Sequence, residues 1–106
     1  MTVKYISIAS DFSPAPAGRY PEDGPFPGAA FRDKLLIPAL KENDEVTVDL
    51  DGTAGFGSSF LEEAFGGLVR AGFPVPELRR RLHINSSRQS YAVRVWGYIE
   101  GAVGAR

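Results

Sequence analysis

Cysteine is absent from this chain, and histidine occurs once, at position 83. Without thiols the protein can form no disulfide, no thiolate nucleophile and no cysteine-ligated metal site. Histidine catalysis would depend on His83 alone, and a zinc ion would need an unusual shell made only of carboxylates. The composition therefore argues against metal enzymology, and we expect no bound metal and no cofactor.

Long apolar runs are also absent. No stretch approaches the ~18 residues that a membrane-spanning helix requires, and the N-terminal "MTVKYISIASDF" has no basic segment followed by an uninterrupted apolar one. We expect a cytoplasmic protein that does not enter a membrane. The hydrophobic fraction of 43% and the charged fraction of 24% are ordinary for a soluble globular domain. The length of 106 residues suits a single domain, 1–106, with one core.

The formal net charge is only -1, but the charge is distributed unevenly. Residues 1–63 are predominantly acidic and residues 64–106 predominantly basic. This asymmetry can indicate an anionic partner or head-to-tail self-association, and a fold that brings the two halves together would neutralise it internally. We do not expect nucleic-acid binding, because the net charge is near zero and no nucleic-acid-reading module is recognisable. The arginines that would carry such binding are Arg79, Arg80, Arg81, Arg88 and Arg94.

The apolar periodicity predicts an α/β fold. A helix between the first two strands makes a β-α-β unit, which favours a right-handed parallel crossover. Pro38 interrupts that helix, so we expect a kink or a split near Leu36 and Ile37. Strands are expected at 2–9, 46–50 and 82–85, and helices at 29–44, around 61–69, around 77–82 and towards the C-terminus, where Ser86 or Ser87 would cap the last helix.

Residues 10–28, "SDFSPAPAGRYPEDGPFPG", contain five prolines and three glycines. Proline removes backbone donors, so the segment is expected to be a loop, and loops this long inside a compact domain are often functional. Its aromatic residues Phe12, Tyr20 and Phe26 indicate that it packs on the body of the domain. Arg19 is its only basic side chain, and it is either solvated or in contact with an anion, because a guanidinium fork suits carboxylates and phosphates.

The stretch "DLDGTAGFGSSFLEEAFGGL", residues 49–68, ends a strand, passes through a glycine-rich turn and enters an acidic amphipathic helix. The spacing Ser59-x-x-Glu62 predicts a capping box, in which the serine accepts from a helical N–H and the glutamate returns to the serine's own N–H. Ser58 is not needed for this cap. Its hydroxyl is therefore left near the free amides of the helix start, where a phosphate or another anion could lie.

Gly66 and Gly67 lie inside this helix, although each costs roughly 0.8–1 kcal/mol relative to alanine. Two such costs indicate a close approach of the helix to the sheet or to the 10–28 loop. The alternative is a partner's backbone that docks against these glycines.

Catalytic motifs are missing around the two serines. The segment "GFGSSF" is not the G-x-S-x-G of a hydrolase, and His83 has no evident catalytic partner. No lysine follows the glycines of "DGTAGFGSS", so it is not a phosphate-binding P-loop. Asp49 and Asp51 share one side of an extended segment and could hold magnesium, although a strand end that meets solvent also explains them. We expect a protein that is not an enzyme.

The stretch "VTVDLDGTAGFGSSFLEEAFGGLV" resembles the STAS domain (sulphate transporter and anti-sigma factor antagonist), whose central strand leads through a short loop into a helix that starts at a phosphorylatable serine. More specifically, the chain resembles the prokaryotic STAS-like family, with "DFSPAPAGRYPEDGPFPG", "FRDKLLIPAL" and an aromatic C-terminal helix in the same order. The resemblance implies an α/β fold with a small, mixed, mainly parallel sheet of about four strands and helices packed on it.

The resemblance also implies a regulatory role in protein–protein switching. STAS antagonists bind partners that include histidine-kinase-like ATPases acting as serine kinases, and phosphorylation of the serine ends the partnership. By position, Ser58 is the phosphorylation candidate and Ser59 its neighbour at the helix start. Many of those antagonists have an aspartate directly before the serine, where this chain has Gly57. The expected interaction surface comprises Asp51, Gly52, Thr53, Gly57, Glu63, Gly66 and Gly67.

Two other kinds of partner stay open. A second copy of the chain would make a homodimer. A phosphate-bearing metabolite would make the protein an anion or nucleotide sensor, in which Arg19, Ser58 and the helix N-terminus form the anion-binding site.

Overall fold

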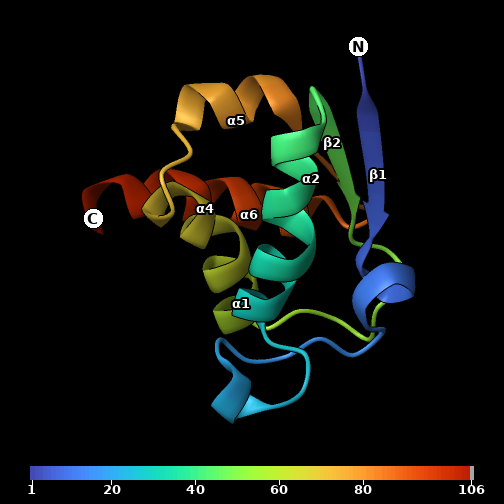
Figure 1. The fold of residues 1–106 in the computed structure, drawn as a ribbon. Coiled ribbons are helices and arrows are strands. Elements are labelled where there is room, and N and C mark those ends of the chain that lie inside the picture. Colours follow the sequence, from blue (N-terminus) through green and yellow to red (C-terminus); the bar gives the residue numbers. More distant parts are fainter. Residues whose placement is uncertain (106) are drawn as a thin grey trace.

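The computed structural model describes residues 1–105, which form a three-stranded sheet with helices packed on it. The strands are β1 (Val3–Ser7), β2 (Glu45–Asp49) and β3 (Leu82–Asn85), in the order β1-β2-β3. Both pairings are parallel. Right-handed crossovers in this order place their helices on the same face, and Figure 1 shows the helices gathered on one side of β1 and β2.

The predicted α/β class is confirmed, but the expected strand count of about four is too high for the residues described. Among the described residues, only these three segments pair as strands. The long segment after β1 is rich in proline, which cannot donate to a strand ladder, so it adds no strand.

The sheet has a buried face and an open face. Ile6, Val48 and Ile84 lie side by side across the three strands and face the helices. On the opposite face Tyr5 is 54% exposed, and its hydroxyl donates to Asp49 Oδ2 at 2.5 Å. Parallel sheets are normally covered on both faces, so this open polar face is a distinctive feature of the chain.

The first crossover helix runs from residue 28 to residue 42. It consists of α1 (Gly28–Phe31), a π-helical turn η3 (Arg32–Leu36) and α2 (Ile37–Glu42). The change of hydrogen bonding falls between Leu36 and Ile37, where the sequence predicts a break. Pro38 has no N–H to donate to the fourth residue back, and the wider π turn accommodates this loss.

The second crossover contains two helices. The first runs from residue 58 to residue 70 as α3 (Ser58–Leu61), η4 (Glu62–Gly66) and α4 (Gly67–Arg70). Its predicted apolar stripe is confirmed, because every one of its members is buried: Leu61, Ala64, Phe65, Leu68 and Val69. The shorter α5 (Val75–Arg81) then leads directly into β3.

The C-terminal helix α6 (Gln89–Gly101) packs on the 58–70 helix and ends in a 3-10 turn, η5 (Ala102–Ala105). No side chain caps α6, so the prediction of a cap from Ser86 or Ser87 is wrong. The Ser86 hydroxyl instead donates to the carbonyl oxygen of Arg88, and Ser87 bonds to Asp51. Among residues 1–105, no helix is long and apolar enough to cross a membrane.

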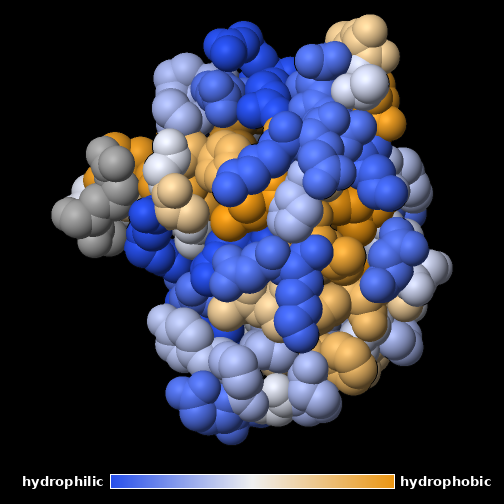
Figure 2. Space-filling model, viewed as in Figure 1, coloured by the Kyte–Doolittle hydropathy of each residue, from blue (hydrophilic) through white to orange (hydrophobic). Residues whose placement is uncertain are grey.

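The proline-rich segment packs on the domain, as its aromatic content predicts. A π-helical turn, η1 (Ile8–Phe12), leads from β1 into the segment, and a 3-10 turn, η2 (Pro21–Asp23), lies in its middle. The Phe12 ring lies 5.5 Å from that of Phe31, in an edge-on contact. Figure 2 shows hydrophilic side chains lying across apolar ones on the helical face of the molecule.

The two crossover helices approach each other closely at Gly28. A Cβ atom added there would lie 2.5 Å from the carbonyl oxygen of Phe60 and 3.0 Å from the amide nitrogen of Ala64. Both atoms belong to the backbone, which cannot yield without moving a helix.

We therefore predict that Gly28→Ala destabilises the protein by about 2 kcal/mol, as overpacking of a core does. Gly97→Ala is the matched control, because a Cβ atom at this exposed position in α6 meets nothing within 4 Å. That change should stabilise by up to ~1 kcal/mol through helix propensity. Urea unfolding measures both variants, and a Gly28→Ala protein as stable as the parent would contradict the close helix contact.

Candidate functional site

The candidate site lies where β2 and β3 end. Parallel strands bring their carboxyl ends to the same edge of the sheet, so the segments that follow Asp49 and Asn85 meet there. Asp51 joins them, because its Oδ1 accepts from the backbone N–H of Ser87 at 2.8 Å and from the Ser87 hydroxyl at 2.9 Å. The loop then turns at Gly52 and Gly55, whose φ angles of 93° and 135° favour glycine.

Asp49 and Asp51 both have protein partners for their carboxylates. Asp49 accepts from the hydroxyl of Tyr5 and from the backbone N–H of Asp51. These bonds favour the interpretation of the pair as a hydrogen-bonded strand end rather than as magnesium ligands.

Ser58 and Ser59 are both exposed in the first turn of the 58–70 helix. Gly57 precedes the helix in an extended conformation, and no side chain caps the helix. The predicted capping box between Ser59 and Glu62 is therefore wrong. The helix begins at Ser58, two residues earlier than the box requires, and the Glu62 carboxylate is bound by arginines. Within residues 1–105 neither serine hydroxyl makes a hydrogen bond.

A buried carboxylate lies one turn further along the helix. The side chain of Glu63 is only 7% exposed, and three arginines surround it. Arg32 Nη1 lies 2.6 Å from Glu63 Oε2, while Arg19 and Arg70 approach Oε1 at 3.3 Å and 3.4 Å. A buried charge is tolerated only where it is paired and hydrogen-bonded, and this one has partners from three separate segments of the chain.

Glu62 extends the same network towards the surface. Arg19 Nη1 lies 2.5 Å from Glu62 Oε1, and Arg70 Nη1 lies 2.8 Å from Oε2. The hydrogen bond from Arg70 is the largest cause of the lowered pKa of Glu62. Burial opposes it, and the bond from Arg19 lowers the pKa further. We call these five side chains the arginine–glutamate network: Arg19, Arg32, Glu62, Glu63 and Arg70.

The network explains the two glycines inside the helix. A Cβ atom at Gly67 would collide with the guanidinium of Arg32, and one at Gly66 would lie 2.6 Å from Glu62 Oε2. The prediction that another part of the protein approaches these glycines closely is confirmed. At Gly67 that part is the side chain of Arg32, from the first crossover helix, and not the sheet or the proline-rich loop. Glu63, Gly66 and Gly67 are all buried, so the prediction that they present an interaction surface is wrong.

Arg19 contacts anions, as one of its two predicted alternatives requires, but these anions are carboxylates of the protein itself. Its guanidinium binds Glu62 and Glu63, and the hydrogen bond to Glu62 is the main cause of its raised pKa. The anion that the guanidinium contacts is therefore part of the protein. An external anion at Arg19 and Ser58 would have to displace two carboxylates, so the predicted anion-binding site at these residues is not formed.

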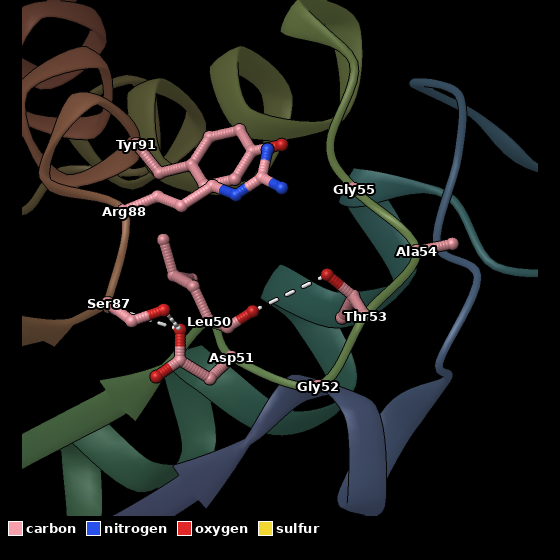
Figure 3. A pocket seen from close by; sticks show the side chains of 9 residues that line it. All are labelled: Leu50, Asp51, Gly52, Thr53, Ala54, Gly55, Ser87, Arg88 and Tyr91. Carbon is pink, nitrogen blue, oxygen red and sulfur yellow. Dashed lines mark hydrogen bonds between the residues drawn. The ribbon is translucent and has the colours of Figure 1, made fainter.

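A polar cavity of about 150 Å³ opens beside the loop after β2. Residues 50–55 line one side, and Ser87, Arg88 and Tyr91 line the other (Figure 3). In Figure 3 the Arg88 side chain extends alongside the Tyr91 ring towards Gly55. Sequence reasoning did not select Arg88 for this place, although its position just after a parallel strand would have indicated the shared edge of the sheet.

The fold and the loop–helix junction define a small STAS-like α/β domain. The model of a family described as a STAS-like domain of unknown function (DUF4325) matches residues 27–92, and the chain belongs to this family. The match includes the first crossover helix, the two serines and the cavity, whereas β1 lies outside it. The comparison with curated proteins gave no match. The comparison with solved structures gave none either.

The lowered pKa of Glu62 makes stability depend on pH in the acid range. A carboxylate whose pKa falls on folding stabilises the native state above its unfolded pKa, near 4.5 here, and this stabilisation is lost as the pH falls through the folded value. We predict that the free energy of unfolding decreases as the pH falls from 5 to 3. In Glu62→Gln the free energy of unfolding should change less steeply with pH.

The slope should not vanish in Glu62→Gln, because backbone hydrogen bonds lower the pKa of Asp23 and Asp44 as well. The exposed Glu42, for which no ion pair is found within residues 1–105, supplies the control variant Glu42→Gln. Urea unfolding at several pH values gives the slopes. Equal slopes for the parent and Glu62→Gln would contradict the role given to Glu62.

Proposed function

We propose that this STAS-like domain is a non-enzymatic regulatory module, which binds a protein partner through the segment from Asp51 to Ser59 and is switched by phosphorylation of Ser58. The observation that carries the proposal is the exposed hydroxyl of Ser58, which lies in the first turn of a helix and makes no hydrogen bond within the described part of the chain. Exposed positions at a strand-to-helix loop are accessible to a kinase, and the STAS resemblance assigns the modified serine to this position.

Most positions of the segment are exposed or half-exposed, and the buried side chain of Phe56 anchors it to the core. Asp51, Gly52 and Gly57 are exposed, and Thr53 is half-buried. A Cβ atom at Gly57 would meet nothing within 4 Å, so the backbone before the serines is open to a partner. The proposed interaction surface therefore consists of loop residues, and it does not include the buried helix residues Glu63, Gly66 and Gly67.

A phosphate on Ser58 would change this surface through electrostatics. It adds roughly 1.5 to 2 negative charges and several strong acceptors, next to the free amides of the helix start. Glu62 lies four residues further on, so its side chain neighbours that of Ser58 on the helix surface. The phosphate would repel Glu62 and compete with it for Arg19, which belongs to the proline-rich segment.

The proposed partner is a histidine-kinase-like ATPase that acts as a serine kinase, as the STAS resemblance implies. A catalytic role for Ser58 itself is not part of the proposal. His83 Nε2 lies 2.6 Å from Glu45 Oε1, so the single imidazole already has a carboxylate partner on the sheet.

The proposal predicts phosphorylation on one serine and a loss of binding with it. Incubation with the ATPase and ATP, followed by mass spectrometry, should find one phosphate on the parent and on Ser59→Ala, and none on Ser58→Ala. Ser59 is the matched control because it is equally exposed in the same turn. Partner binding should persist in Ser58→Ala and weaken at least tenfold in Ser58→Glu, which a titration by calorimetry measures.

Two results would overturn the switch. One is the absence of phosphate on Ser58, or phosphate on Ser59 in its place. The other is equal partner binding by Ser58→Ala and Ser58→Glu.

A further inference from the structure

Arg88 differs from most other arginines of the chain, because its guanidinium has no partner among the residues that the structure describes. Arg19, Arg32 and Arg70 bind glutamates of the network, Arg79 pairs with Glu100, and Arg81 binds Glu77. For the Arg88 guanidinium, no ion pair or hydrogen bond is found within residues 1–105. It lines the cavity at the carboxyl ends of β2 and β3 (Figure 3). Ligands of open α/β sheets bind outside the carboxyl ends of the strands, and this cavity lies at that edge.

The opposite wall of the cavity supplies further hydrogen-bonding groups. The backbone N–H groups of Gly52, Thr53 and Gly55 have no acceptor among the described residues, and all three residues line the cavity. Glycine-rich turns with free N–H groups are suited to oxyanions. A phosphate group has enough oxygens to accept from a guanidinium and from several amides, whereas a carboxylate has only two.

Asp51 adds an acceptor to the same wall. Its Oδ1 is used by Ser87, but no bond to its Oδ2 is found within residues 1–105. A free carboxylate oxygen repels a bare anion, and it binds a hydroxyl donor well. The cavity therefore combines a cation for an anionic group with an acceptor for a hydroxyl group.

The size of the cavity limits the ligand. A volume of about 150 Å³ is close to that of an engineered protein cavity that admits benzene. It is smaller than the ~300 Å³ at which pockets for larger organic ligands begin. A phosphate with a short hydroxylated chain matches this space.

We propose that this cavity binds a small phosphate monoester that carries a hydroxyl group, with Arg88 holding the phosphate and Asp51 accepting from the hydroxyl. The site is separate from the modification of Ser58, and it replaces the one that the sequence places at Arg19. Tyr91 forms its wall beside the Arg88 side chain.

Glycerol 3-phosphate is the probe, and ¹H–¹⁵N chemical-shift titration of the parent protein is the measurement. The amides of Gly52, Gly55 and Ser87 should shift in a saturable way. Inorganic phosphate should bind at least fivefold more weakly, because it has no hydroxylated chain to reach Asp51. Glycerol and glycerate should shift these amides only at far higher concentration, since one lacks the anion and the other lacks the phosphate.

Three variants assign the contacts. Arg88→Ala should weaken glycerol 3-phosphate binding at least tenfold, while Arg80→Ala should leave it unchanged. Arg80 is the matched control, because it is exposed on α5, has no ion pair within residues 1–105 and carries the same charge. Asp51→Asn retains an oxygen for Ser87 and removes the carboxylate charge. It should abolish the preference for glycerol 3-phosphate over inorganic phosphate and strengthen the binding of phosphate itself.

The proposal is overturned if the three amides do not shift, if glycerate binds as tightly as glycerol 3-phosphate, or if Arg80→Ala weakens binding as much as Arg88→Ala. Ser58→Ala should bind the probe like the parent, and a loss of binding there would place the ligand at the serine instead. Because no partner protein takes part, failure of this experiment leaves the phosphorylation switch standing, and failure of the switch leaves this site standing.

Discussion

The buried carboxylate of Glu63 is the interaction on which the arrangement of the domain depends. An unpaired carboxylate in that position would cost several kcal/mol, so the fold must bring guanidinium groups to it. They come from the proline-rich segment, from the first crossover helix and from the end of the helix that carries Glu63 itself. The network thereby fixes the proline-rich segment and two helices relative to one another, and Gly67 leaves the room that Arg32 requires.

This constraint also determines what the loop–helix junction can do. Because Glu62 is bound by Arg19 and Arg70, it is not available to cap the helix start. The serines of the first turn are left exposed, with no hydrogen-bond partner among residues 1–105. Hydrogen bonds from Ser87 to Asp51 connect the neighbouring loop to the segment that follows β3. The two segments form the walls of the cavity beside Arg88. The exposed hydroxyl of Ser58 and the cavity thus adjoin the same short loop.

Local patterns predicted the elements well and the charged contacts poorly. The apolar stripe of the 58–70 helix, the strand Leu82–Asn85 and the change of hydrogen bonding before Pro38 all follow from local periodicity and from the missing proline donor. The burial of Glu63 does not, because it depends on arginines that lie 31 and 44 residues away in the chain. The capping-box motif failed for the same reason, since long-range partners compete for its glutamate.

A double-mutant cycle between Arg32 and Glu63 tests this account most directly. The variants are Arg32→Met, Glu63→Gln and the combination, each unfolded in urea at neutral pH. Residues that share a buried ionic contact are coupled, and the account predicts a coupling free energy of about 2 kcal/mol, with the double variant more stable than the two single losses imply. Additive losses, within about 0.5 kcal/mol, would show that the two side chains act independently and would contradict the account.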